Sequence, residues 1–241
     1  MKKQLLFLLL LLAACGQKED TKKNNTTEDK TVTPTASSEN YSTSIVTEDD
    51  FLNAKNNFKD PTLYDTASFR KNNGKIELPL QDKKQRFAVF KDTLVDAASE
   101  DVRQYVYVGQ FDKLGLYIVG GSFWEHFECY LINKTTGQQT TIWNDPMPSS
   151  DNKYMASLSL RYGLEGIPNG LQLWKIINEA GKGYSLQKYF EIDQQIWIPE
   201  DFAWETNETL VLKVFAVQKY WNEAERRPED YYYLRIRIKQ M

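Results

Sequence analysis

The stretch FECYLINKTTGQQTTIW, residues 127–143, holds two short runs of β-branched and aromatic residues on either side of a polar turn. The turn ends at Gly137, which adopts a positive φ without steric cost. A connection this short joins antiparallel neighbours, because parallel strands need a crossover of a dozen or more residues. The stretch therefore predicts an antiparallel hairpin, with Cys129 buried in its first strand.

The same pattern continues along most of the chain. Further strands are expected at residues 76–80, 86–91, 102–110, 115–121, 154–162, 170–177, 185–192, 196–197, 209–217 and 231–239. About twelve short strands separated by turn signals predict an all-β, mainly antiparallel domain.

A short helix is expected ahead of the first of these strands. Thr47 and Asp50 have the spacing of a short capping box, and Phe51, Ala54 and Phe58 fall on one helical face. We expect this N-terminal helix to pack on the β domain through that face.

Two polar turns share one plan, in which an Asp or Asn precedes an apolar strand. They are centred on Asp151 and Asn207. The first resembles the Ser-Pro-Asp-Gly-Lys turn of TolB-like and WD40-like propeller blades, with Ser150 and Asn152 in place of the Pro and Gly. The resemblance implies a partial, propeller-like stack of antiparallel sheets, and a β-sandwich is the alternative.

The N-terminus has the layout of a secretory signal. Lys2 and Lys3 precede an apolar run at residues 5–12, and LAAC follows at residues 12–15. The run is too short for the roughly 20 residues that a membrane-spanning helix needs. The motif resembles the lipobox of bacterial lipoproteins, which implies a signal peptide at 1–14, acylation of Cys15 and attachment to a lipid bilayer.

The segment from Cys15 to residue 44 is rich in Lys, Glu, Asp, Asn, Thr and Ser. Such a segment buries too little apolar surface to offset its ordering entropy, so we expect a disordered tether, followed by a β-rich domain at 45–241. Gly16 after the cysteine implies outer-membrane sorting. Residues 17–20, QKED, are similar to the signal that exports some Gram-negative lipoproteins to the cell surface.

Few residues have the spacing of a reactive centre. His126 is the single histidine, and 33 acidic against 30 basic residues give a net charge of -3. Asn144, Asp145 and Asp151 offer oxygen ligands at a spacing that matches no calcium loop. We therefore expect no catalytic residue, no metal, no cofactor and no nucleic-acid partner.

Aromatic residues are in excess, with 6 Trp, 14 Tyr and 12 Phe. Phe123, Trp124, Tyr220 and Trp221 lie near loops and are the expected ligand-binding residues, although β proteins also use aromatics to fill their sheets. The sequence predicts a non-catalytic lipoprotein of the outer membrane or cell surface. Its domain would bind an envelope protein or a glycan, or serve as an envelope accessory. A surface-anchored hydrolase with unidentified acidic residues is the alternative.

Overall fold

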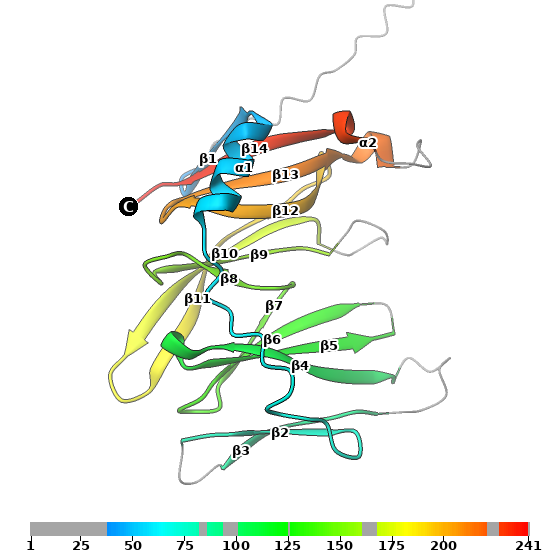
Figure 1. Cartoon of the computed structure of the whole chain (residues 1–241), viewed down its shortest axis with the longest axis vertical. Helices are drawn as coiled ribbons and strands as arrows, with labels where there is room; N and C mark the ends of the chain where they lie inside the picture. The colour runs from blue at the N-terminus through cyan, green and yellow to red at the C-terminus, as the bar shows by residue number, and fades with distance from the viewer. Residues whose placement is uncertain are drawn as a thin grey trace, which may run out of the picture. The chain divides into compact units, whose positions relative to one another are not determined.

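The computed structural model describes residues 38–81, 86–93, 101–124, 126–160, 168–220 and 227–240. These residues form four antiparallel sheets (Figure 1), which we name in chain order. Cys15, the rest of the predicted N-terminal signal and Trp221 lie outside the described residues. The expected all-β, mainly antiparallel fold is confirmed.

The sheets follow one another along the chain, and within each sheet consecutive strands pair, except that the first described strand pairs with the last. Sheet I contains β2 (Lys75–Pro79) and β3 (Phe87–Lys91). Sheet II contains β4 (Arg103–Phe111), β5 (Leu116–Phe123), β6 (Phe127–Asn133) and β7 (Gln139–Ile142). Sheet III contains β8 (Met147–Pro148), β9 (Tyr154–Leu158), β10 (Gly170–Glu179) and β11 (Gly183–Asp193). Sheet IV contains β12 (Trp197–Thr206), β13 (Thr209–Ala216), β14 (Tyr231–Ile238) and β1 (Tyr41–Val46).

The core lies between sheets that pack face to face. In β5, Ile118 packs against sheet III while the next residue, Val119, packs against sheet I. The period of two along a strand thus supplies two separate interfaces. The largest apolar cluster lies between sheets III and IV and includes Leu173, Trp204 and Leu212. Burying each such side chain stabilises the fold by about 1.5–3 kcal/mol.

The expected N-terminal helix is α1 (Glu48–Asn57). Its capping box is present, because Thr47 accepts a bond from the Asp50 amide and the Asp50 carboxylate accepts one from the Thr47 amide. Phe51 and Ala54 are buried against the face of sheet IV that is turned away from sheet III. The helix therefore covers the outer face of the last sheet.

The sequence analysis missed the strands β1 and β8 and predicted only a small part of β12. β1 occupies Tyr41–Val46 and pairs with β14 along its whole length, so the expected tether boundary at 44 is too late. Serines and threonines at 42–44 are compatible with an edge strand as well as with a tether. β12 runs over ten residues instead of two, because this edge strand tolerates Pro199 at a register shift. The two-residue strand β8 was not expected.

The two turns of the proposed repeat occupy equivalent places. The turn at Asp151 joins the edge strand β8 of sheet III to β9, and the turn at Asn207 joins the edge strand β12 of sheet IV to β13. They also touch, since the Asp151 amide donates to Asn207 Oδ1 at 3.2 Å. The β4–β5 turn holds the same place in sheet II. The propeller-like stack stays a prediction, because other all-β folds also contain antiparallel sheets of this size.

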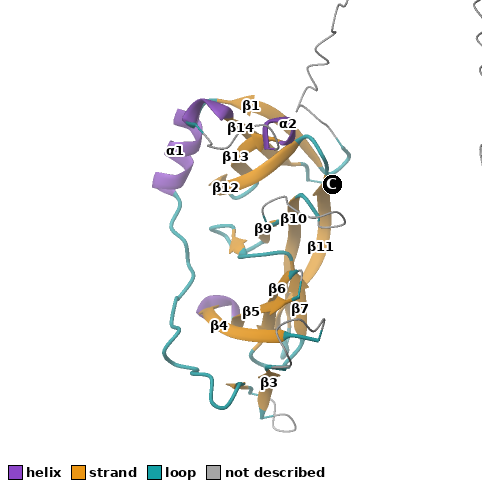
Figure 2. Cartoon of the chain, turned by 90° about the vertical axis from the view of Figure 1, so that its right-hand side faces the viewer, coloured by secondary structure: helices purple, strands orange, loops and turns teal. Residues whose placement is uncertain are grey.

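The segment between α1 and β2, residues 58–74, is here called the strap. Figure 2 shows it running beside the sheets from α1 to the sheet I end. It is fastened to the free edge of β4 by two backbone hydrogen bonds between Leu63 and Gln110, of 2.9 and 3.0 Å. Gly109 permits this contact, because a Cβ there would lie 2.5 Å from the Leu63 carbonyl oxygen. No helix within the described ranges is long and apolar enough to span a membrane.

Candidate functional site

The predicted ligand-binding residues fall in two different sheets. Phe123 ends β5 and is half-buried, and Trp124 follows it with 47% of its surface exposed. Tyr220 ends the short helix α2 (Val217–Tyr220), in the connection between β13 and β14. Sheet III lies between sheets II and IV, so the two loops do not form one surface. The structure places Phe123 against Tyr105, which lines a groove, and Trp124 follows Phe123 in the chain, whereas Tyr220 lies in another sheet connection.

Phe123 belongs to a continuous row of rings on the face of sheet II that meets sheet I. The row comprises Phe90, Tyr105, Tyr130, Phe123 and His126. Tyr105 is its centre, with ring centroids 5.2 Å from Phe90, 6.1 Å from Tyr130 and 6.1 Å from Phe123. His126 stacks on Phe123 at 4.5 Å with nearly parallel planes. The row extends from the interface of sheets I and II to the loop that carries Trp124.

A groove of about 220 Å³ opens over this row, between β3 and sheet II. We name it the aromatic groove. Its lining residues are Val89, Phe90, Lys91, Thr93, Arg103, Tyr105, Tyr130 and Gln139. Aromatic rings with polar and cationic groups at their rim suit a ligand that has both apolar and polar surfaces.

Asp92 holds the two walls of the groove together. Its Oδ1 accepts the Tyr105 amide at 2.9 Å, and its Oδ2 pairs with Lys71 Nζ at 2.6 Å. Thr93 and Arg103 exchange backbone hydrogen bonds of 2.9 and 3.2 Å directly beside it. These contacts fix the end of β3 on the start of β4, so the groove is rigid before any ligand arrives.

The charge of the groove is positive at one wall. Lys91 and Arg103 are exposed, and neither side chain has an ion pair within the described residues. The Glu128 carboxylate accepts a hydrogen bond from the Tyr130 hydroxyl and lies 3.8 Å from His126 Nε2. Burial, and then this bond to Glu128, raise the pKa of the Tyr130 phenol well above its usual value. Tyr130 therefore remains a neutral donor.

Other groups considered from the sequence have structural roles. Cys129 is buried in β6, as expected, and burial raises the pKa of its thiol far above its usual range. The Asp151 carboxylate accepts hydrogen bonds from Ser149 Oγ at 2.8 Å and from the Lys153 amide at 3.2 Å, which stabilise its turn. Among the residues that the structure describes, no three His, Cys, Asp or Glu side chains gather to hold a metal ion.

The sequence did not indicate Lys91, Arg103, Tyr105 or Tyr130 as site residues. Arg103 and Tyr105 are two apart in β4, which places them on one face of the sheet. That spacing is visible in the sequence, but the pairing that brings β3 and β6 beside them is not. No protein-family model, no curated protein and no solved structure matches this chain.

Proposed function

We propose that this chain is a non-catalytic, lipid-anchored binding module of the bacterial outer membrane or cell surface, and that its aromatic groove binds an acidic glycan. The observation that carries the ligand proposal is the unbroken row from Phe90 to His126, flanked by Lys91 and Arg103, which have no ion pair among the residues that the structure describes.

The chemistry of the groove supports a sugar over an apolar ligand. The C–H face of a sugar ring packs on an aromatic face, and its hydroxyl groups need polar partners at the rim. Gln139 and Thr93 supply such partners in the lining of the groove. An acidic substituent adds charge-assisted hydrogen bonds to Arg103, whose planar fork matches a carboxylate or sulfate.

The anchor is supported by the sequence alone. The LAAC motif at 12–15 is suited to acylation of Cys15, and the polar segment after it is suited to be a tether between the lipid and the folded domain. The measurement is incorporation of radiolabelled palmitate in a Gram-negative host, followed by membrane fractionation. Wild type should carry the label and sediment with membranes, and Cys15→Ser should do neither. A Cys15→Ser chain that still sediments with membranes would contradict the anchor.

The glycan proposal is tested with matched oligosaccharides. Full-length chain carrying Cys15→Ser is titrated with oligogalacturonate and with a neutral oligosaccharide of the same length. We expect the acidic sugar to bind more tightly, and Arg103→Gln to weaken its binding about tenfold, as loss of one charge-assisted hydrogen bond predicts.

Arg237→Gln is the control, because Arg237 is an exposed cation in β14 of sheet IV, away from the groove. Equal binding of the neutral sugar, or equal losses in the two variants, would refute an acidic-glycan site. Release of shorter sugars during the titration would favour the hydrolase alternative instead.

A further inference from the structure

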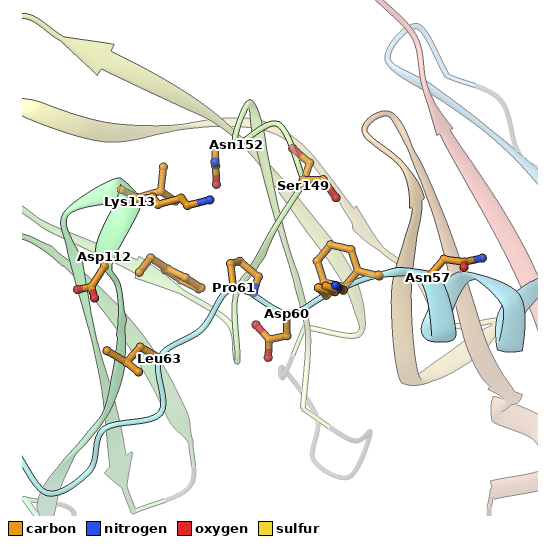
Figure 3. A pocket seen from close by; sticks show the side chains of 13 residues that line it. Asn57, Asp60, Pro61, Leu63, Asp112, Lys113, Ser149 and Asn152 are labelled. Carbon is orange, nitrogen blue, oxygen red and sulfur yellow. The ribbon is translucent and has the colours of Figure 1, made fainter.

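A second and larger cavity lies under the strap, at the opposite ends of the strands from Trp124. Its volume is about 560 Å³, within the range of small-molecule sites. Three segments far apart in sequence line it: the strap with the end of α1 (residues 57–63), the β4–β5 turn (residues 111–114) and the β8–β9 turn (residues 149–152). Figure 3 shows the three segments around one space. We name this the strap cavity.

The floor of the strap cavity is apolar. Phe111 and Leu114 line it, and each is only 2% exposed. Phe58, half-buried, adds a second ring from the strap. A ligand in the cavity therefore gains free energy by removing its own apolar surface from water.

The two acidic side chains in the lining already have partners. Asp112 Oδ1 lies 3.0 Å from Lys134 Nζ. The Asp60 carboxylate accepts hydrogen bonds from the Thr62 amide at 2.9 Å and from the Tyr64 hydroxyl at 2.9 Å. Asp112 is thus paired with a lysine, and Asp60 keeps its charge while its carboxylate oxygens accept hydrogen bonds from within the strap.

The two lysines that line the cavity differ from these acidic residues. Lys59 and Lys113 have no ion pair within the described part of the chain. Figure 3 shows the Lys113 ammonium and the Asn152 amide extending into the same space, whereas the Asp112 carboxylate turns away from it. Asn152 lies in the β8–β9 turn with a backbone φ of 59°, and its backbone amide donates to the Ser149 carbonyl at 2.9 Å. The cavity thus presents a cation and a side-chain amide above an apolar floor.

We propose that the strap cavity binds a small organic anion. Lys113 and Asn152 hold its acidic group, and its apolar body rests on Phe111, Leu114 and Phe58. This site is separate from the aromatic groove and does not depend on the glycan proposal.

The test uses three probes of one shape and different charge: 1-naphthoate, 1-naphthamide and 1-naphthylmethylamine. Binding to the full chain carrying Cys15→Ser is measured by calorimetry near physiological ionic strength. We expect naphthoate to bind at least about tenfold more tightly than the amide, as one charge-assisted hydrogen bond predicts. The amine should bind most weakly.

Two variants locate the site. Lys113→Met should lower naphthoate affinity about tenfold while leaving the amide unchanged, because it removes only the charged partner. Lys153→Met is the matched control: Lys153 follows Asn152 on the same turn, pairs with Asp151 at 3.2 Å and does not line the cavity. Circular dichroism confirms that both variants are folded. Equal binding of acid and amide, no binding of naphthoate, or equal losses in the two variants would each overturn the proposal.

Discussion

Replacing Gly109 by alanine tests whether the strap is fastened as the structure shows. The added Cβ would lie 2.5 Å from the Leu63 carbonyl oxygen and 3.3 Å from Tyr64 Cα, which are backbone atoms of the strap. The strap must then move away from β4, and both backbone hydrogen bonds between Leu63 and Gln110 break. We expect the strand itself to persist, because Gly109 pairs with Ile118 on its other side.

The magnitude follows from two opposing effects. Two hydrogen bonds contribute about 0.5–1.5 kcal/mol each, so their loss costs about 1–3 kcal/mol. Alanine restricts the unfolded chain and returns about 0.5–1 kcal/mol. The unfolding free energy should therefore fall by up to about 2.5 kcal/mol. Naphthoate binding in the strap cavity should weaken because Phe58 leaves the lining.

Hydrogen exchange locates the change. The amides of Leu63 and Gln110 should exchange about tenfold faster or more in Gly109→Ala, while amides in the middle of β5 keep their protection. Gln104→Ala, an exposed change in the same strand, is the control and should leave both amides protected. If the Leu63 amide stays protected in Gly109→Ala and stability changes by less than about 0.3 kcal/mol, the proposed clash is wrong.

Three further perturbations concern stability, and each is measured by urea unfolding. Hydrogen bonds from Lys219 and from a backbone amide lower the pKa of the buried Asp230 well below its ordinary 3.8. The contribution of this carboxylate to the unfolding free energy is therefore complete above pH 3.8 and is lost as the pH falls below it. Asp230→Asn should reduce the loss of stability that wild type shows below about pH 4. Burial and a hydrogen bond to Glu48 raise the pKa of Tyr233 to about 12. The contribution of the Tyr233 hydroxyl to the unfolding free energy is present below pH 10 and is lost as the pH rises through about 12. Tyr233→Phe should reduce this loss of stability at alkaline pH. Thr47→Ala removes the α1 cap and should cost about 1 kcal/mol at neutral pH, whereas an unchanged midpoint would contradict the capping role.

The hairpins were predictable because their signals are local. Gly137 has the positive φ that its turn requires, and Cys129 lies buried in the strand that precedes it. β1 was missed for the opposite reason: its serines and threonines become a strand only because β14, almost 200 residues later, offers an edge. Pro199 hid most of β12 in the same way, since only the sheet order shows that this strand lies at an edge.

The candidate sites show the same division. Phe123 and Trp124 were identified from composition near a loop, whereas Arg103 and Lys91 became site residues only through the contact of sheets I and II. Nothing in the sequence indicated the strap cavity, because the three segments that line it are far apart in the chain. Side chains that meet through tertiary packing cannot be paired without the fold.

Sheet IV joins the two ends of the chain, with Tyr41 opposite Ile238 and the Lys239 amide bonded to the Asn40 carbonyl. A ribosome therefore delivers the first strand of this sheet long before its partner exists. Until β14 emerges, β1 has no strand to pair with and α1 lacks Tyr233, one of the residues on which it packs. Completion of sheet IV thus waits for β14, and deleting either β1 or β14 removes a strand from the same sheet.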